Sequence, residues 1–140
     1  MAKTFLKLNE GVSYDFFLFG IICQHKDYRL CRELNLKLNL AMKREEDLDV
    51  FNPKRMENQS FSFFQFVNEE EDQFNLLANK SSKGLLIPEH KQMDYVFLIR
   101  PGRTKIDEQE MYDSVREISI ILGAYRLDVR KLKSKENLVF

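Results

Sequence analysis

The sequence predicts an α+β fold: a mostly antiparallel sheet with two helices packed on one face. Several short segments carry apolar residues in alternation or in continuous runs, as strands do. Two other segments carry them at intervals of three and four, which is the period of one helical face. The order is strand, helix, three or more strands, helix, strand, and it favours helices on one side of a sheet. We predict a ferredoxin-like arrangement with an added β-hairpin; the alternative is a sheet of different strand order.

The composition is that of one globular domain. The chain of 140 residues contains 12 Phe and 5 Tyr but only 5 Gly and 3 Pro, which is typical of a compact core and not of a low-complexity chain. We therefore expect a single domain spanning residues 1–140. Basic and acidic residues both number 22, so no overall charge attracts polyanions or membrane surfaces. The longest apolar run, Phe16 to Cys23, is far shorter than the about 20 residues that cross a bilayer.

The chain begins with two predicted strands and a helix. Residues 4–8 alternate weakly, and residues 14–23 are apolar enough to be buried on both faces of a sheet. Alternate leucines from Leu34 to Leu40 also fit a strand, so we expect the helix to end and the chain to become extended near Leu40. The helix itself is predicted over residues 26–38 from the residues on its apolar face: Leu30, Cys31, Leu34 and Leu38.

The middle of the chain predicts strands and turns. Residues 45–58 mix acidic residues with a proline, which indicates a short strand followed by a loop. Residues 60–67 and 73–79 are the arms of a predicted hairpin, and the acidic turn between them, residues 68–72, is expected to be solvated. Residues 95–99 predict a buried strand that stops at a Pro-Gly pair.

A second helix and a strand are predicted after this pair. The helix begins with capping residues near Asp107, carries apolar residues at spacings of four and three from Met111 to Leu122, and is expected to end at Gly123. Alternation from Tyr125 to Val129 then indicates a strand with one buried side. The apolar ending, residues 138–140, predicts a docked C-terminal tail, either on its own domain or across the two-fold axis of a homodimer.

The segment IPEHKQMDY, residues 87–95, has two interpretations. Pro88 fixes its own φ and pushes Ile87 toward an extended conformation, and carboxylates beside it can accept backbone N–H groups, which together indicate a structural joint. The alternative is the acid/base cluster of a hydrolase or transferase, formed by Glu89, His90, Asp94 and Tyr95. We favour the joint, because turn and ion-pair networks supply such clusters without catalysis. No enzymatic activity is therefore expected.

No metal or cofactor site is expected either. Cys23, Cys31, His25 and His90 lack the paired spacing of structural zinc sites, so we interpret them as core thiols and ordinary histidines. Phosphate-loop, dinucleotide, metallopeptidase and α/β-hydrolase motifs are missing. The N-terminus lacks the pattern of a secretory signal, which favours a cytoplasmic location with reduced cysteines.

Charge is segregated along the chain although it sums to zero. Between Glu45 and Asp72 nine acidic residues stand against two basic ones, a net charge of minus seven, so the rest carries plus seven. If the basic residues meet in the fold they form a phosphate-binding patch, to which Tyr112 or Tyr125 adds a stacking surface. The alternative, which we favour, is a solvated sheet edge protected against strand addition. The candidate nucleic-acid-binding residues are Arg100, Arg103, Lys105, Arg126, Arg130, Lys131 and Lys133.

The segment IPEHKQMDY resembles the signature of the IPExxxVDY family of small proteins from Bacteroidota-type bacteria. Met93 stands where the signature has Val, which is an apolar-for-apolar change. The resemblance extends to DYRLCRELN near residue 27, REEDL at 44, LLANKS at 76 and the closing LKSKENLVF. It implies no catalytic residue and no cofactor, because the family has no established activity. The residues that match the signature are Ile87, Pro88, Glu89, Asp94 and Tyr95.

These observations together predict a non-enzymatic cytosolic interaction or assembly protein. It is expected to bind a protein partner through a sheet edge, the acidic hairpin or the C-terminal tail, with residues 87–95 shaping that surface. The alternative is an RNA-binding accessory factor that uses the basic residues at 100–105 and 126–135. An enzyme is the third hypothesis.

Overall fold

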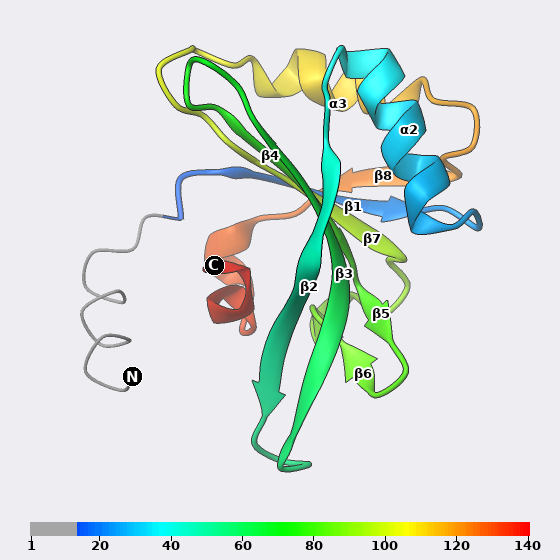
Figure 1. Ribbon diagram of the computed structural model, residues 1–140, viewed down its shortest axis with the longest axis vertical. Coiled ribbons are helices and arrows are strands. Elements are labelled where there is room, and N and C mark those ends of the chain that lie inside the picture. Colours follow the sequence, from blue (N-terminus) through cyan, green and yellow to red (C-terminus); the bar gives the residue numbers. More distant parts are fainter. Residues whose placement is uncertain (1–13) are drawn as a thin grey trace.

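The computed structural model describes residues 14–140, so the predicted strand at residues 4–8 lies outside the described part. It contains a six-stranded sheet in the order β2-β3-β4-β7-β1-β8, in which every neighbouring pair is antiparallel (Figure 1). The predicted α+β class is therefore confirmed. In chain order the elements are β1 (Phe17–Ile22), α2 (Asp27–Leu38), β2 (Lys43–Asn52), β3 (Glu57–Val67), β4 (Gln73–Ala78), β5 (Lys80–Ser81), β6 (Gly84–Leu85), β7 (Tyr95–Arg100), α3 (Glu108–Arg116) and β8 (Gly123–Arg126).

The connections follow the β-α-β-β-α-β pattern of ferredoxin-like folds. The chain leaves β1 through α2, and it returns through α3 to β8, which pairs with the free side of β1. β4 and β7 complete the four-stranded part, and β2 and β3 extend the sheet beyond β4. In Figure 1 the β2–β3 hairpin reaches past the rest of the molecule. We call its outer half, residues 48–61, the arm.

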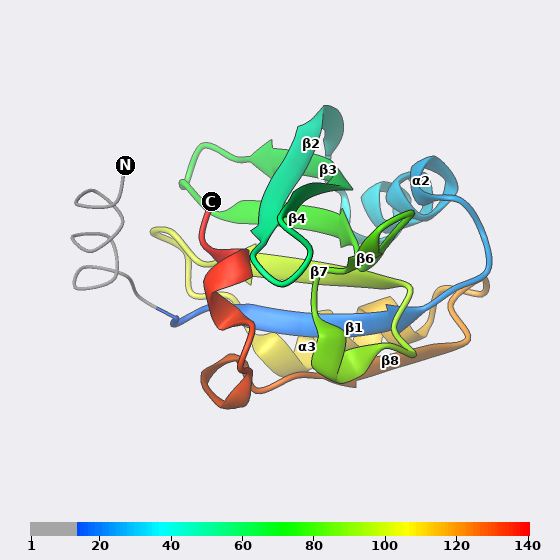
Figure 2. The same ribbon diagram turned by 90° about the horizontal axis from the view of Figure 1, so that it is seen from below.

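The sheet is buried on both faces, which explains why β1 and β7 are almost wholly apolar. One core lies between the sheet and the two helices and includes Phe19, Leu34 and Phe97. The second core lies on the opposite face, where it is covered by the C-terminal segment and the chain around β6 (Figures 1 and 2). It includes Ile87 and Leu138. The tail thus packs on its own domain.

The first helix follows the helical period and not the alternation of leucines. Leu30, Cys31 and Leu34 are buried, whereas Leu36 is 68% exposed. The helix ends at Leu38, and Asn39 adopts a left-handed conformation with φ 57°, which an asparagine tolerates better than most residues.

The second helix ends at Arg116, so its predicted extension to Gly123 is wrong. Its start is as expected, because the Asp107 carboxylate accepts hydrogen bonds from the backbone N–H groups of residues 109 and 110. After Arg116 the chain makes tight turns, and the N–H of Leu122 donates to the carbonyl of Ile22 at 2.8 Å. The backbone of residue 122 therefore pairs with β1, and the helix does not continue to Gly123. Leu122 is left exposed, while Ile121 fills the core in its place.

Two further predictions about strands are corrected. Residues 45–58 are not a short strand and a loop: β2 runs from Lys43 to Asn52, turns through residues 53–56 and pairs with β3, with a bulge between Glu45 and Leu48. The charged residues of β2 are accommodated because β2 lies at the edge of the sheet, where its outer side faces water. The predicted strand at 125–129 ends at Arg126, and Val129 lies in a short 3-10 turn.

The turn of residues 68–72 is acidic, but it is not wholly solvated. Asp72 is only 2% exposed, and its carboxylate accepts hydrogen bonds from the Gly102 N–H at 2.6 Å and from the Asn68 amide at 3.1 Å. Burial alone would raise the pKa of Asp72, but these bonds and those from Thr104 outweigh it and lower the pKa below its ordinary 3.8. This carboxylate therefore stabilises the contact between the turn and the chain after β7.

Candidate interaction surface

The segment 87–95 forms a joint between β6 and β7. Pro88 begins a 3-10 turn, and Ile87 is fully buried beneath it. Asn79, which is also fully buried, holds the joint. Its side-chain oxygen accepts the Ile87 N–H at 2.7 Å, and its side-chain nitrogen donates to the carbonyls of His90 and Met93, both at 3.0 Å. One side chain thus satisfies three backbone groups that no strand could pair.

Glu89 connects the joint to the C-terminal segment. Its carboxylate accepts hydrogen bonds from the backbone N–H of Ser134 at 2.9 Å and from the Ser134 hydroxyl at 2.7 Å. Burial is the largest single influence and would raise the pKa of Glu89, but the hydrogen bonds from Ser134 and from the backbone of Glu89 and Lys133 together outweigh it and lower the pKa below its ordinary 4.5. The Asn137 amide donates to the Leu86 carbonyl at 2.9 Å. The joint therefore fastens the tail to the second core.

Asp94 and Tyr95 connect the joint to the end of β1. One oxygen of Asp94 accepts the Cys23 N–H at 2.9 Å, and the other pairs with Lys80 at 2.8 Å. The Tyr95 hydroxyl donates to the His25 carbonyl at 2.6 Å, and burial raises its pKa to about 12. Glu89 and Asp94, two members of the cluster in the enzyme hypothesis, thus hydrogen-bond to different segments.

Three segments of the family resemblance meet at this joint. IPEHKQMDY supplies its backbone, LLANKS supplies Asn79, and LKSKENLVF supplies Ser134 and Asn137. Within residues 14–140 no group of three or more His, Cys, Asp or Glu side chains is arranged to hold a metal, and both cysteines are buried free thiols. Among the described helices, none combines the length and apolarity required to cross a membrane.

The predicted basic residues do not form one patch. The Arg100 guanidinium lies 4.5 Å from the Phe16 ring centre and donates to the Leu138 carbonyl at 2.8 Å, and burial lowers its pKa. It is thus part of the tail's packing. Arg103 pairs with Glu71 in the acidic turn at 2.7 Å. Lys105 and Lys133 are exposed.

The remaining basic residues of that prediction lie beside acidic ones. Arg126 and Arg130 line one depression of about 460 Å³, but Asp15, Glu108 and Asp128 line it too. Arg130 pairs with Asp15, and Lys131 lies 4.0 Å from Asp128. Tyr112, proposed as a stacking surface, is covered: Arg116 and Arg126 lie over its ring at 5.2 and 4.8 Å. Tyr125 is exposed.

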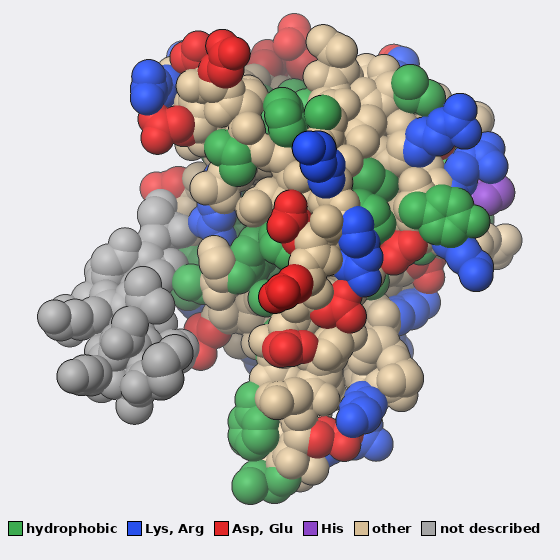
Figure 3. All heavy atoms as spheres, viewed as in Figure 1, with side chains coloured by type: hydrophobic (Ala, Val, Ile, Leu, Met, Phe, Trp, Pro, Cys, Tyr) green, Lys and Arg blue, Asp and Glu red, His purple; other side chains and the backbone are tan. Residues whose placement is uncertain are grey.

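A basic surface that sequence reasoning missed lies at the start of α2. His25, Lys26, Arg29 and Arg32 are exposed on this segment, and so is Tyr28, at 66%. Figure 3 shows Lys and Arg side chains gathered beside this helix together with a histidine. The signal was present in HKDYRLCR, but the helix was interpreted only through its buried face.

The arm is the second surface that sequence reasoning missed, because residues 45–58 were assigned partly to a loop. Exposed acidic side chains lie along β2, and hydrophobic side chains gather at the end of the arm (Figure 3). Phe51 is 53% and Met56 is 75% exposed. Met56 also has a left-handed backbone with φ 54°, which costs a non-glycine residue about 1 kcal/mol.

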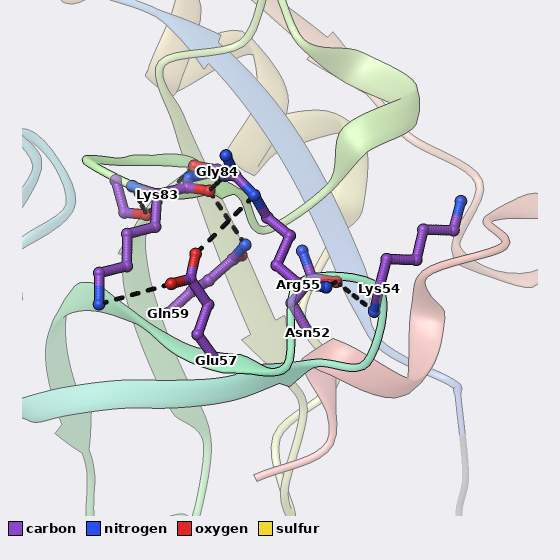
Figure 4. A network of polar contacts seen from close by, with 8 residues as sticks. Asn52, Lys54, Arg55, Glu57, Gln59, Lys83 and Gly84 are labelled. Atoms are coloured by element: carbon purple, nitrogen blue, oxygen red, sulfur yellow. Dashed lines mark hydrogen bonds and ion pairs between the residues drawn. The ribbon is translucent and has the colours of Figure 1, made fainter.

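Hydrogen bonds and ion pairs brace the arm against the β5–β6 turn (Figure 4). Arg55 and Gln59 both donate to the Lys83 carbonyl, and Glu57 lies 3.8 Å from Arg55 and 3.9 Å from the Lys83 ammonium group. The Asn52 side chain accepts the backbone N–H groups of residues 54 and 55. These contacts hold the end of the arm in place, so Phe51 and Met56 are exposed on an ordered hairpin.

A groove connects the arm to the joint. Its volume is about 270 Å³, and it runs from the end of β2 past β6 to the C-terminal segment. Pro88 of the signature reaches this groove, whereas Glu89, Asp94 and Tyr95 hydrogen-bond to other segments of the chain. Residues that line it include Val50, Phe51, Pro53, Leu85, Pro88 and Asn137.

Comparisons with protein-family models, with curated proteins and with solved structures found no match for this chain. The resemblance to the IPExxxVDY family therefore stays a prediction.

Proposed function

We propose that this chain is a non-enzymatic cytosolic interaction protein that binds a protein partner through the arm and the adjoining groove. The observation that carries the proposal is the exposed apolar end of the arm, Phe51 and Met56, held in place by the network around Lys83. Single exposed apolar residues are ordinary on protein surfaces. A braced apolar tip next to a groove is instead typical of an interaction site.

The backbone of Met56 supports the same proposal. A left-handed methionine at an exposed position lowers stability without serving the core. Binding explains why such a residue is used there, because methionine adapts its shape to a partner surface. The hydrogen bonds of Glu89 and Asp94 to the backbone of other segments support a structural role for both carboxylates.

The test is to purify the tagged protein from its native cell and to quantify co-purifying proteins by mass spectrometry, with and without ribonuclease. We compare the wild type with a Phe51→Ser, Met56→Ser double variant. The matched control is Leu36→Ser, which removes an equally exposed apolar side chain from α2.

Because buried anchor residues each contribute about 2 kcal/mol or more to an interface, we expect the double variant to recover at least about tenfold less of the partner. The control should retain the partner, also after ribonuclease. A set of co-purifying proteins that is the same for the double variant and the wild type would contradict the proposal.

RNA binding is the second candidate, and the basic surface at the start of α2 is the observation that favours it. Lys26, Arg29, Arg32 and the Tyr28 ring are all exposed on this segment, with Arg29 also 3.6 Å from Glu33, and basic side chains beside an aromatic ring are suited to phosphates and a stacked base. We expect single-stranded RNA to be retarded at low salt, with weaker binding by an Arg29→Gln, Arg32→Gln variant and a shallower salt dependence. If no RNA is retarded at low salt, this candidate is excluded.

A further inference from the structure

We propose that the arm binds an extended segment of a partner protein, rich in lysine or arginine, that adds to the outer side of β2 as a further strand. This inference rests on the proposed function and names the chemistry of the partner. It follows from three features of β2: its open edge, its acidic row and the apolar groove at its end.

The open edge provides the backbone groups for pairing. β2 lies at the end of the six-stranded order and pairs with β3 alone among the strands that the structure describes. Alternate residues of an edge strand point their N–H and C=O groups away from the sheet. From Leu48 to Asn52 the pairing with β3 is regular, so the outer side of this stretch can form backbone hydrogen bonds with a further strand.

The acidic row selects the charge of the incoming strand. Asp49 lies within the regular stretch, Glu45, Glu46 and Asp47 lie at the bulge just before it, and all four are exposed. Asp47 is paired with Arg44, and Asp49 accepts the Ser60 hydroxyl. Neither Glu45 nor Glu46 makes an ion pair with any described residue. Opposite charges across neighbouring strands stabilise pairing and like charges oppose it, so a basic strand is favoured and a second copy of β2 is repelled.

Charges and bulges on edge strands also serve to prevent strand addition. This explanation accounts for the acidic residues and for the bulge between Glu45 and Leu48. It does not account for Phe51, which is exposed beyond the bulge on the regular stretch. Protection against every partner does not require an exposed phenylalanine. Selection of one partner combines repulsive charges, which exclude other strands, with attractive apolar contacts.

The groove defines one end of the partner segment. It opens beside the last residues of β2, and its apolar lining, Val50, Phe51, Pro53, Leu85 and Pro88, is flanked by the polar residues Asn52, Lys54, Gln59 and Asn137. A strand paired along Leu48 to Asn52 brings its end to this groove, where a large apolar side chain is buried. The ligand class is therefore an extended segment with alternating basic residues and a terminal apolar residue.

The test uses a synthetic, fluorescent peptide that alternates lysine with valine and ends in leucine. Its binding to the full chain is measured by anisotropy at several salt concentrations, and the affected amides are mapped by NMR. Two control peptides carry glutamate in place of lysine or N-methyl groups on alternate backbone nitrogens, which prevents strand pairing.

We expect the lysine peptide to bind more weakly as salt rises, to perturb β2 amides and to bind at least about tenfold more tightly than either control peptide. A Glu45→Gln, Glu46→Gln variant should bind it about tenfold more weakly. A Glu69→Gln, Glu70→Gln variant, which removes the same charge from the turn between β3 and β4, should bind it like the wild type.

Three results would overturn the inference. Equal binding of the N-methylated peptide would exclude strand addition, and equal loss in the two glutamine variants would indicate unspecific charge attraction. A dimer formed by the wild type and strengthened in the Glu45→Gln, Glu46→Gln variant would identify a second copy as the occupant. If the lysine peptide fails to bind while Phe51→Ser, Met56→Ser still loses its cellular partner, the proposed function stands and only the basic strand is wrong.

Discussion

At the scale of single residues, Asn79 shows how much of this fold depends on one buried amide. It is separated by eleven residues from His90 and by fourteen from Met93, and it hydrogen-bonds to both. No periodicity indicates this role, because an asparagine next to a lysine in LLANKS fits an ordinary turn. The role exists only because β4, the joint and β7 are brought together.

We predict that Asn79→Ala destabilises the protein by roughly 2–5 kcal/mol, because the Ile87 N–H and two carbonyls lose their partner inside the fold. Urea unfolding followed by circular dichroism measures this change. Asn58→Ala, at an exposed position of β3, is the control and should change stability by no more than about 0.5 kcal/mol. A cost as small as that of the control would refute the role of Asn79.

Met56 allows a prediction in which stability and binding move in opposite directions. Replacing it with glycine relieves the left-handed backbone, so we expect Met56→Gly to raise the free energy of unfolding by up to about 1 kcal/mol. The same change removes an exposed apolar side chain from the arm and should reduce recovery of the partner. A stabilised variant with undiminished partner recovery would remove Met56 from the interaction surface.

At the scale of elements, the β3–β4 turn and the chain after β7 are joined by Asp72 and Gly102. A Cβ atom on Gly102 would lie 2.4 Å from backbone atoms of residues 70 and 71, so the close approach requires glycine. Pro101-Gly102 was interpreted as a strand stop, and β7 does end at Arg100. The contact of the same Pro-Gly pair with the acidic turn could not be predicted from the sequence and is seen only in the tertiary structure.

The lowered pKa of Asp72 predicts how stability depends on pH. A carboxylate with a lowered pKa stabilises the fold at pH values above its ordinary 3.8, and it loses that contribution as the pH falls through the folded-state pKa. We therefore expect Asp72→Asn to lose about 1–3 kcal/mol at pH 7 and to approach the wild type below pH 3.8. Urea unfolding at several pH values tests this, with the exposed Glu69→Gln as control. A difference that is independent of pH would contradict it.

At the scale of the whole molecule, the C-terminal segment acts as a further layer over the sheet. Leu138 is fully buried in the second core, Phe140 packs edge-on against Phe63 at 5.1 Å, and Arg100 lies between the Phe16 and Phe140 rings. The joint and the tail thus cover the face opposite the helices, and the groove beside the arm depends on both.

We predict that Leu138→Ala costs about 2–5 kcal/mol, as expected for a leucine removed from a packed core. Leu122→Ala makes the same chemical change at an exposed position and should cost no more than about 0.5 kcal/mol. Thermal unfolding by calorimetry measures both and should show one transition for the wild type if tail and domain form one cooperative unit. Equal costs for the two variants would show that the tail adds no stability.

The fold class, the buried central strands, the first helix and the hairpin at 60–79 can all be predicted from the sequence. These follow from apolar periodicity, which is local and is imposed by burial on one or two faces. The joint character of residues 87–95 was also predicted, because the φ of proline is restricted wherever it occurs.

Which polar groups meet cannot be predicted from the sequence. Glu89 and Ser134 are 45 residues apart, and Asp94 and Cys23 are 71 apart, so their pairing depends on strand order and leaves no periodic signal. The end of α3 and the extent of β2 were likewise decided by pairing with β1 and β3, which outweighed local preference. The basic residues of the predicted patch likewise find different partners in space: Arg103, Arg130 and Lys131 pair with acidic residues, whereas the Arg100 guanidinium lies over the Phe16 ring.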